Sequence, residues 1–338
     1  MLDRIPLAIQ TSLAELLDQL RLQQISAFGR DAAFLRRERK GRYYWYVRPP
    51  QANGKRTERY LGPETDALLA MIKRAKDQQV GANVRRTIVR SLLAAGLPGA
   101  DDRTGKVIRS LSEAGLFRLR GALVGTVAFQ HYPGLLGVNL PLPALRTGDL
   151  DIAQDYGVSV ALDDELEQSF FDLLRGVSED FRPVSKPLEP ARVARYVLPD
   201  GFAVDVLTTS RGGGDESSSR LRPLRTDATP LRFMDFLLRE TIDAATLHED
   251  GVLVRVPAPA RFAVHKLIIS RKRGPANPKS PKDFHQAVSL IQALGVIDPF
   301  ALRDAYGEAR DRGPEWRKLL DEAVSLLPDR ARAILEKT

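Results

Sequence analysis

The segment Thr147-Gly148-Asp149-Leu150-Asp151-Ile152-Ala153 decides the fold, because its acidic and apolar side chains alternate. A β-strand sends every second side chain to the same face. On a strand, Asp149 and Asp151 therefore point to one face, while Leu150 and Ile152 point into a core. Two adjacent carboxylates repel each other unless a positive charge lies between them, and Mg²⁺ prefers such oxygen ligands. A half-buried strand with two solvated acids is the alternative interpretation.

The composition restricts the class of protein. A chain of 338 residues with 43% hydrophobic and 28% charged residues is expected to form two or three globular domains. It has no cysteine, which excludes disulfides and thiolate metal sites, and its four histidines show no zinc-binding spacing. No apolar run is long enough to span a bilayer, and the first residues do not resemble a signal peptide. A cytoplasmic location without membrane contact is expected.

The charge of the chain is uneven. Lys and Arg number 51 against 43 Asp and Glu, a formal net charge of +8. Ten Lys or Arg and three Asp or Glu lie between Arg30 and Gly62, so most of the excess lies in this window. A basic balance favours a polyanionic partner such as nucleic acid or a nucleotide.

The charge and the motifs divide the chain into four segments. These are a basic α+β hairpin module (residues 1–62), a helical bridge (63–115), a catalytic core (116–210) and a mostly helical C-terminal domain (211–338).

The N-terminal module is predicted to contain an amphipathic helix and a basic, aromatic hairpin. Tyr43–Val47 and residues 57–61 are predicted strands, joined by a turn at Asn53-Gly54. Such a hairpin can stack on or follow a nucleic acid; an ordinary hairpin packed on the first helix is the alternative. The residues expected to contact nucleic acid are Arg42, Tyr44, Tyr46, Arg48, Lys55 and Arg56.

A glycine follows the first predicted strand of the core. Leu119–Val124 is a predicted strand, and a helical pattern begins directly after Gly125 and Thr126. A glycine at a strand-to-helix junction lets phosphate approach backbone N–H groups, and a threonine adds a hydroxyl donor. A plain tight turn is the alternative. A loop rich in Gly and Pro is predicted over residues 133–143.

A third carboxylate lies in a later strand. Residues 192–197 and 202–207 are predicted strands joined by a turn, and the second contains Asp205 between two valines. Buried neighbours make a lone acid costly unless it is paired or bound to metal. A helix capped by Asp163 or Asp164 is predicted upstream of these strands.

Basic residues gather in the C-terminal part. Seven Lys or Arg and no acid lie between Arg261 and Lys282, where one helix is predicted and a second begins. Lys266 and Arg271 can approach a triphosphate from one side if Arg271 lies at the helix end; a solvated basic face is the alternative. A loop rich in Gly and Ser over residues 211–225 is expected to be flexible, either as a flap or as an uninvolved surface loop.

The order of these motifs resembles the DNA polymerase beta-like nucleotidyltransferase superfamily. Its pattern is a glycine-hydroxyl turn, an acid pair and a third acid, here Val124-Gly125-Thr126, Asp149-Leu150-Asp151-Ile152 and Val204-Asp205-Val206. In this chain 22 residues lie between the turn and the acid pair, more than is usual in the superfamily, and an inserted loop at residues 133–143 would accommodate them.

The C-terminal pattern is similar to that of the abortive-infection nucleotidyltransferase toxins. Lys266 in the run Ala263–Ile268, then Arg271 and Lys282-Asp283, match their order of basic and acidic residues. A little-studied bacterial family named only for its nucleotidyltransferase fold is also similar. The core resemblance covers about residues 115–295 and leaves out the N-terminal module.

The resemblance implies an α+β fold, in which flanking helices, the basic hairpin module and the helical C-terminal domain surround a mixed β-sheet core. It implies transfer of a nucleoside monophosphate from an NTP to a hydroxyl, with release of pyrophosphate. Asp149 and Asp151 would hold two Mg²⁺ (or Mn²⁺) ions, and Asp205 would hold one of them and help to deprotonate the hydroxyl. The nucleotide-binding residues would be Gly125, Thr126, Lys266, Arg271 and Lys282.

RNA, in particular a tRNA end, is the first expected acceptor, because of the basic hairpin and the toxin resemblance. A protein hydroxyl or a small molecule such as an aminoglycoside is the next expectation, and a toxin-like role would add an antitoxin protein as a partner. The alternative from another class is a nucleic-acid-binding or regulatory protein on a catalytically degenerate scaffold. Acids at all three motif positions argue against this alternative.

Overall fold

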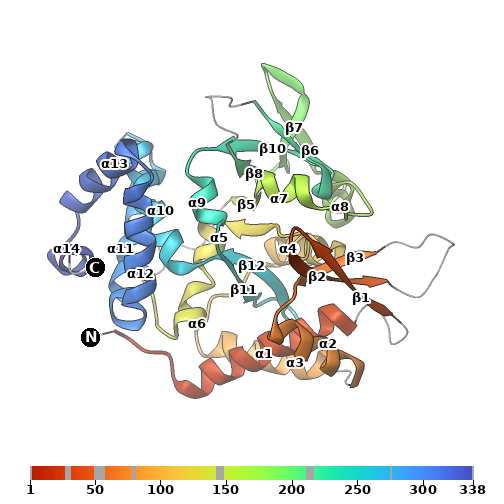
Figure 1. The fold of residues 1–338 in the computed structure, drawn as a ribbon. Helices are drawn as coiled ribbons and strands as arrows, with labels where there is room; N and C mark the ends of the chain where they lie inside the picture. Colours follow the sequence, from red (N-terminus) through yellow and green to blue (C-terminus); the bar gives the residue numbers. More distant parts are fainter. Residues whose placement is uncertain are drawn as a thin grey trace.

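Two parallel strands, β5 (Asp149–Gln154) and β8 (Ala203–Thr209), lie in the middle of the main sheet (Figure 1). The computed structural model describes residues 2–26, 32–48, 58–77, 81–141, 148–210, 217–274 and 276–336. Within these ranges the main sheet has seven strands in the order β4-β5-β8-β10-β9, with β7 also paired to β8 and β6 paired to β7. The other strands are β4 (Ala122–Val124), β6 (Arg182–Lys186), β7 (Glu189–Val197), β9 (Ser219–Leu221) and β10 (Thr226–Leu231).

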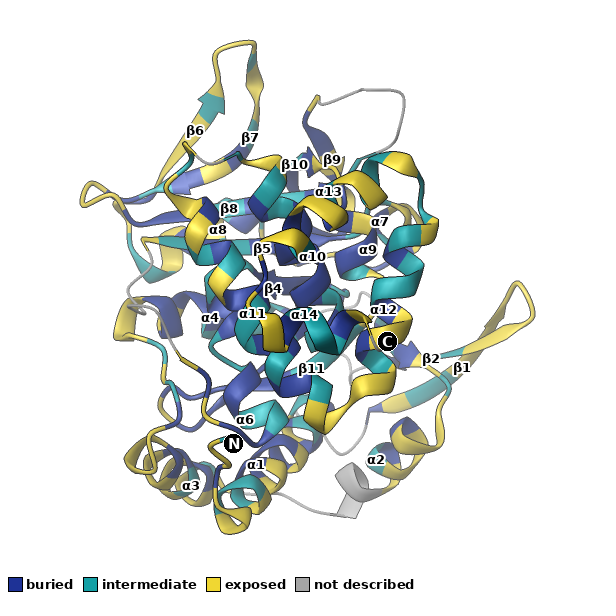
Figure 2. Cartoon of the chain, turned by 90° about the vertical axis from the view of Figure 1, so that its left-hand side faces the viewer, coloured by how far each residue is buried: buried dark blue, intermediate teal, exposed yellow. Residues whose placement is uncertain are grey.

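The alternation of the quoted segment is confirmed. Leu150 and Ile152 on β5, and Val204 and Val206 on β8, have no exposed surface. The sheet is mixed, because β5, β8 and β10 run parallel while the other pairs are antiparallel. Figure 2 shows buried residues along these strands and exposed residues at the tip of the β6–β7 hairpin. The fold is therefore α+β with a mixed sheet, as predicted.

The N-terminal module packs on the rest of the chain. The module contains α1 (Leu7–Ser26), β1 (Ala33–Arg39), β2 (Arg42–Arg48) and β3 (Arg59–Pro63), and the helical bridge begins with α2 (Asp66–Asp77) and α3 (Ala82–Ala94). The three strands form an antiparallel sheet. Tyr46 and Tyr60 belong to the same hydrophobic core as the main sheet. The first helix is amphipathic, as predicted, and its buried face includes Leu13, Leu16, Leu17 and Leu20.

Strand β1 is missed by the sequence analysis, because it holds a basic run without an apolar alternation. Its residues are mostly exposed, so the sequence carries no buried face to reveal the strand. The predicted turn at Asn53-Gly54 lies outside the described residues. In the helical bridge, Val84 is 51% exposed, although its spacing predicts a core position.

The middle of the chain contains four short helices and one longer one. They are α4 (Asp102–Ala114), α5 (Gly125–Phe129), α6 (Tyr132–Leu136), α7 (Tyr156–Ala161) and α8 (Phe170–Val177). Asp101 caps α4 by accepting a hydrogen bond from the backbone N–H of Thr104, and Gly115 ends that helix in a left-handed conformation.

Two predictions in this region are wrong. The strand predicted from Leu119 begins only at Ala122. The predicted loop over residues 133–143 contains α6, and residues 142–147 lie outside the described part. Proline fits the first turn of a helix, so Pro133 does not prevent α6.

The predicted cap at Asp163 or Asp164 is also wrong, although a helix, α8, is present downstream. The caps are Asp155 for α7 and Ser169 for α8. Asp164 is instead buried, where it accepts hydrogen bonds from Arg118 and from the backbone N–H of Tyr60. A capping residue and a buried ion-pair partner carry the same side chain, so local sequence does not distinguish them.

The C-terminal part begins with strands and ends with helices. Its elements are the 3₁₀ turn η1 (Arg222–Leu224), α9 (Met234–Leu238), β11 (Thr241–Thr246), β12 (Val252–Pro257), α10 (Pro259–Lys272), α11 (Lys279–Ile297), α12 (Pro299–Asp311), α13 (Pro314–Ser325) and α14 (Asp329–Glu336). The last five helices gather on one side of the sheet (Figure 1). Among these helices Leu320 is buried, and Trp316 and Leu319 are partly buried.

The sequence analysis misses β6, β9, β10, α9 and β11. Because β9 and β10 belong to the main sheet, that sheet extends past residue 210, where the catalytic core was predicted to end. Residues 211–216 of the predicted flexible loop lie outside the described part, and residues 219–224 form β9 and η1. None of the described helices is long and apolar enough to cross a membrane.

Candidate active site

Three aspartates lie on the neighbouring strands β5 and β8, as the sequence analysis expects. Asp149 and Asp151 are two residues apart on β5, so both point to one face of the sheet. Asp205 on β8 is the register partner of Asp151. Paired residues on adjacent strands share a face, so the three carboxylates lie on the same side of the sheet.

Two cationic side chains hold these carboxylates. Arg195 on β7 is the register partner of Asp205 on its other side, and its Nη1 donates to Asp205 Oδ2 at 2.6 Å. Its Nη2 lies 3.7 Å from Asp149 Oδ1. Lys279, in the first turn of α11, donates from Nζ to Asp149 Oδ2 at 2.9 Å. The chain itself thus places positive charge among the acids.

The surroundings of the two paired aspartates disfavour their charged forms. Burial raises the pKa of Asp151 to about 6, and the neighbouring Asp205 carboxylate raises it as well. Burial also raises the pKa of Asp205, although Arg195 acts in the opposite direction. Carboxyl groups with raised pKa values in a cleft are candidates for a functional site.

Gly125 contacts the buried carboxylate. Its φ is +65°, and a Cβ atom at this position would overlap Asp151 Oδ2 and lie 3.1 Å from its Cγ. A glycine is therefore required where β4 meets α5, because only hydrogen leaves room for the carboxylate. The sequence analysis expects Gly125 to approach phosphate; the structure places it against Asp151, at the edge of the same cleft.

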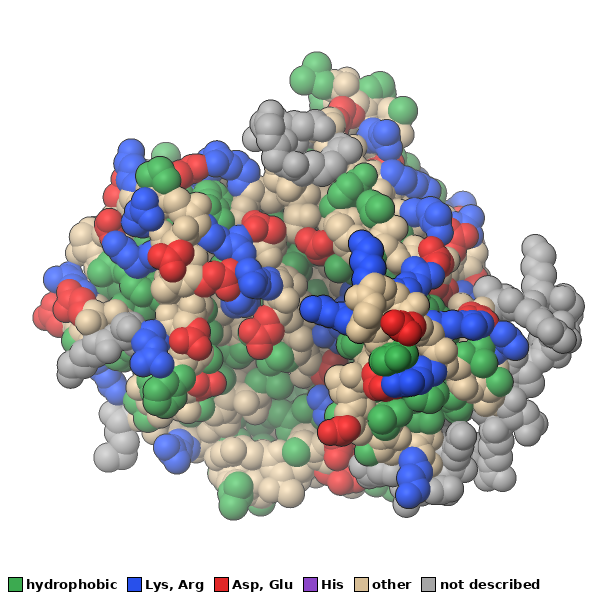
Figure 3. All heavy atoms as spheres, in the orientation of Figure 1, with side chains coloured by type: hydrophobic (Ala, Val, Ile, Leu, Met, Phe, Trp, Pro, Cys, Tyr) green, Lys and Arg blue, Asp and Glu red, His purple; other side chains and the backbone are tan. Residues whose placement is uncertain are grey.

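A cleft of about 480 Å³ opens beside the aspartates. Asp151 and Asp205 line it from the sheet, and α10 supplies one long wall. The residues of α10 and its C-terminal end that line the cleft are Phe262, His265, Lys266, Ile269, Lys272 and Arg273. Figure 3 shows the molecule hollowed between the C-terminal helices on the left and the strands on the right. A cleft of this volume suits a small-molecule ligand.

The predicted nucleotide-binding residues are only partly brought together. Gly125 and Lys266 line the cleft, whereas Thr126, Arg271 and Lys282 are not among its lining residues. The Arg271 guanidinium lies 5.6 Å from the centre of the Phe284 ring. Burial lowers the pKa of Lys282, and the nearby charge of Lys266 lowers it further.

Other cations line the cleft in place of Arg271 and Lys282. They are Lys186, Arg232, Lys272, Arg273 and Lys279. Asp283 holds two of the basic residues, because it accepts a hydrogen bond from Lys266 at 2.5 Å and another from Arg273. The basic run between Arg261 and Lys282 predicts that cations line the site. It does not show which of them face the cleft, because that depends on how α10 and α11 pack.

The carboxylates are not gathered as a formed metal centre. Among the residues that the structure describes, no three acidic or histidine side chains converge closely enough to ligate one metal ion. Arg195 and Lys279 hold two of the three carboxylates. Metal binding by Asp149, Asp151 and Asp205 stays a prediction.

The predicted nucleic-acid-binding residues lie in the N-terminal sheet, and two of them do not present free groups. Tyr46 is 8% exposed and packs edge-on against Tyr60, with ring centres 5.5 Å apart, so its ring is not offered to a base. Arg48 donates to Glu58 at 2.6 Å. Arg42 is exposed and Tyr44 is half-buried. Lys55 and Arg56 lie outside the described residues.

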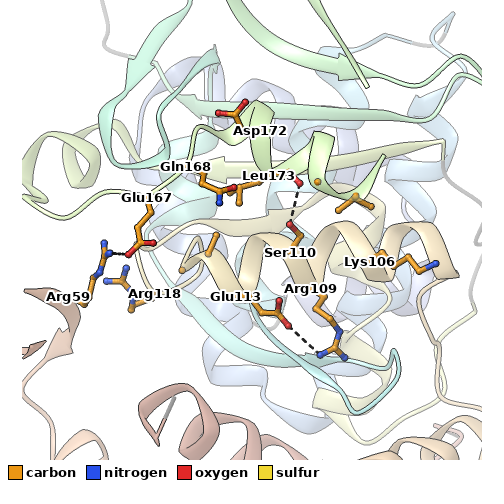
Figure 4. A pocket seen from close by; sticks show the side chains of 14 residues that line it. Arg59, Lys106, Arg109, Ser110, Glu113, Arg118, Glu167, Gln168, Asp172 and Leu173 are labelled. Carbon is orange, nitrogen blue, oxygen red and sulfur yellow. Dashed lines mark hydrogen bonds and ion pairs between the residues drawn. The ribbon is translucent and has the colours of Figure 1, made fainter. Parts of the chain in front are cut away.

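A second, larger groove of about 710 Å³ lies between α4, α8 and β3. Figure 4 shows that Ser110 donates to the Leu173 carbonyl across it and that Arg59 pairs with Glu167 at one end. None of Asp149, Asp151 and Asp205 lines this groove. Each of its four bases is paired with an acid of the groove or of its surroundings, so we place the candidate active site in the cleft beside β5 and β8.

This fold and cleft define an α+β protein with paired carboxylates on a mixed sheet and a basic helix facing them. The sequence model of a nucleotidyltransferase family matches residues 102–311, and the chain belongs to this family. The match confirms the predicted superfamily and supports a nucleotidyl-transfer activity. The likeness to the abortive-infection toxins stays a prediction.

The chain is similar to the solved structure of an antigenic nucleotidyltransferase-like protein from Paracoccidioides brasiliensis. The two sequences are 18% identical, and the match covers 66% of this chain and 94% of that chain with a TM-score of 0.30. No curated protein matches the sequence.

Proposed function

We propose that the protein is a metal-dependent nucleotidyltransferase that moves a nucleoside monophosphate from an NTP to a hydroxyl and releases pyrophosphate. The observation that carries this proposal is the register pairing of Asp151 with Asp205 at a cleft whose facing helix supplies Lys266. Acids on one wall and cations on the other match a ligand that combines metal ions with a triphosphate.

The donor set fits a divalent metal in its chemistry. Three carboxylates share one face of the sheet, and Mg²⁺ and Mn²⁺ favour carboxylate oxygens. Burial raises the pKa values of Asp151 and Asp205 and so disfavours their charged forms, which a bound cation would favour. Asp149 and Asp205 would join Asp151 as ligands once Lys279 and Arg195 release them. A metal bound there would neutralise charge on the phosphates and activate a hydroxyl.

The chain's own residues would position the substrate. Lys266 lines the cleft and is held by Asp283, so its ammonium group is fixed where a triphosphate would bind. In the reaction, the hydroxyl oxygen bonds to the α-phosphorus, and the bond from that phosphorus to pyrophosphate breaks. The hydroxyl proton would pass to Asp205, because burial raises the pKa of this carboxyl toward that of a useful base.

We further propose an RNA hydroxyl as the acceptor. Lys186, at the end of β6, lines the cleft and lies on the β6–β7 hairpin, which projects beyond the sheet (Figure 1). A cation on a projecting hairpin, together with the net charge of +8, favours a polyanionic acceptor. The toxin-like role and the antitoxin partner stay predictions from the resemblance.

The test is transfer of label from the four α-labelled NTPs to total RNA in the presence of Mg²⁺ or Mn²⁺. We expect labelled RNA with the native protein and a loss of at least about 100-fold with Asp149→Asn. The matched control is Asp163→Asn, because the Asp163 side chain is 66% exposed and lies outside the cleft lining.

Two results would contradict parts of this proposal. Label that moves to protein or to a small molecule would exclude RNA as the acceptor but would still support nucleotidyl transfer. A protein that binds no NTP with metal yet binds RNA in a salt-sensitive manner would favour the nucleic-acid-binding alternative on a degenerate scaffold.

A further inference from the structure

Helix α10 presents two stripes of residues to the cleft. Residues seven apart lie nearly in line along a helix, so His265 and Lys272 form one stripe, and Lys266 and Arg273 form the other. Both members of the second stripe donate to Asp283 on α11. In the first stripe, the Lys272 ammonium lies 6.0 Å from the ring centre of Phe233, at the start of α9. The His265 stripe therefore faces the α9 side of the cleft.

The α9 side of the cleft carries apolar side chains, with the cations Arg232 and Lys272 beside the Phe233 ring. Phe233, Met234 and Leu237 line it from α9, and Phe262 and Ile269 line it from α10. Lys266 and Arg273 lie on the neighbouring stripe, where Asp283 holds both, so the cleft has a part where cations gather and a part where apolar side chains gather. A nucleoside triphosphate has the same division, with a charged triphosphate at one end and a flat base at the other.

His265 is a buried polar residue without a partner. It is 7% exposed, and neither of its ring nitrogens has a hydrogen-bond partner among the residues that the structure describes. Buried polar atoms in native proteins are nearly always paired, so an unpaired one calls for an explanation. Both nitrogens are covered, so a ligand would reach them only after the side chains that cover them move.

We propose that the apolar part of the cleft binds the nucleoside of the NTP and that His265 forms hydrogen bonds with it. This inference rests on the proposed function and adds the residue that recognises the nucleoside. Burial lowers the pKa of His265 to about 3, with further lowering by Lys266 and Arg273, so the ring is neutral near pH 7. A neutral imidazole offers one N–H donor and one acceptor, which suits a base edge or a ribose hydroxyl.

Because both ring nitrogens are unpaired, a substitution of His265 should affect both stability and nucleoside binding. Replacing His265 by Phe keeps an aromatic ring and removes two unpaired polar atoms from the interior. We therefore expect His265→Phe to raise the free energy of unfolding and to weaken nucleoside recognition. A histidine with a purely structural role would show the opposite effect on stability.

The matched control is Gln286→Leu. Gln286 on α11 is 1% exposed, and both polar atoms of its side-chain amide lack partners in the described part of the chain. It is not among the residues that line the cleft. We expect this substitution to raise stability as well and to leave ligand binding unchanged.

The experiment compares inorganic tripolyphosphate with the four NTPs by titration calorimetry in Mg²⁺, using the full-length chain. We expect the native protein to bind at least one NTP more tightly than tripolyphosphate. His265→Phe should lose about tenfold in affinity for that NTP, the change expected from one hydrogen bond, and should bind tripolyphosphate within twofold of the native protein. His265→Gln, which keeps a donor and an acceptor, should retain part of the lost affinity.

Three outcomes would overturn the inference. An unchanged NTP affinity in His265→Phe would exclude contact with the nucleoside. An equal loss of affinity for tripolyphosphate in His265→Phe would show that the substitution affects phosphate binding or the fold instead of nucleoside binding. A native protein that binds NTPs no better than tripolyphosphate would remove the nucleoside site and leave the proposed function intact. A native protein that binds neither ligand would overturn the proposed function itself.

Discussion

The contact between Gly125 and Asp151 makes a sharp prediction for Gly125→Ala. Gly125 has a φ of +65°, which an L-residue rarely adopts, and an added Cβ would overlap the Asp151 carboxylate. The matched control is Gly41→Ala. Gly41 has a φ of +71° and no heavy atom within 4 Å of the position that a Cβ would take. The two substitutions share the backbone strain and differ in the steric contact.

The two effects can be separated in size. A left-handed conformation costs an alanine about 1–2 kcal/mol, and we expect both variants to lose that much stability. In Gly125→Ala the Asp151 carboxylate must also move, by roughly 1 Å, to restore ordinary contact. A shift of this size in a catalytic group can lower the rate by about 100-fold. We therefore expect Gly125→Ala to lose as much stability as Gly41→Ala or moderately more. We expect it to lose far more activity than Gly41→Ala.

The measurements are urea unfolding for stability and transfer of label from α-labelled NTP for activity, at a temperature where both variants are folded. Gly41→Ala should keep activity within about twofold of the native protein, because its turn lies in the N-terminal sheet. If Gly125→Ala is as active as Gly41→Ala, the position of Asp151 does not depend on this glycine, and our account of the junction is wrong.

Two further predictions concern buried acids. The folded-state pKa of Asp151, about 6, lies above its ordinary value of 3.8, so the unfolded chain releases this proton first as the pH rises. Asp151 should therefore lower the free energy of unfolding by about 1–3 kcal/mol as the pH rises from 3.8 to 6, and urea unfolding of Asp151→Asn should lack this dependence. Asp164→Ala should lower the free energy of unfolding by about 3–5 kcal/mol, because it leaves the buried Arg118 without its acid. The exposed Asp163→Ala serves as the control, and equal unfolding midpoints for these two variants would refute the second prediction.

The three aspartates can be predicted from the sequence because acidic and apolar residues alternate around them within each strand. The strand pattern around Asp149, Asp151 and Asp205 requires only that apolar neighbours be buried, and the four neighbours are fully buried. The basic stretch after Arg261 likewise predicts a cationic wall, and Lys266 lies in it. Each of these predictions depends on residues within a few positions of each other.

Sequence reasoning is less successful for contacts between distant segments. Arg195 lies on β7 and faces Asp205 only because β7 pairs with β8 in one register. Lys279 reaches Asp149 across an interval of 130 residues. Arg271 is excluded from the cleft lining by the way α10 packs, although its chemistry is the same as that of Arg273.

The sequence by itself determined that two strands each carry acids between buried apolar residues, because burial of alternate side chains is a local property of a strand. Only the tertiary structure decided that Asp151 lies opposite Asp205, that Gly125 lies against Asp151, and that Arg195 and Lys279 hold the other carboxylates. The physical reason is that strand register and helix packing are set by the whole core, in which residues far apart in the chain compete for the same partners.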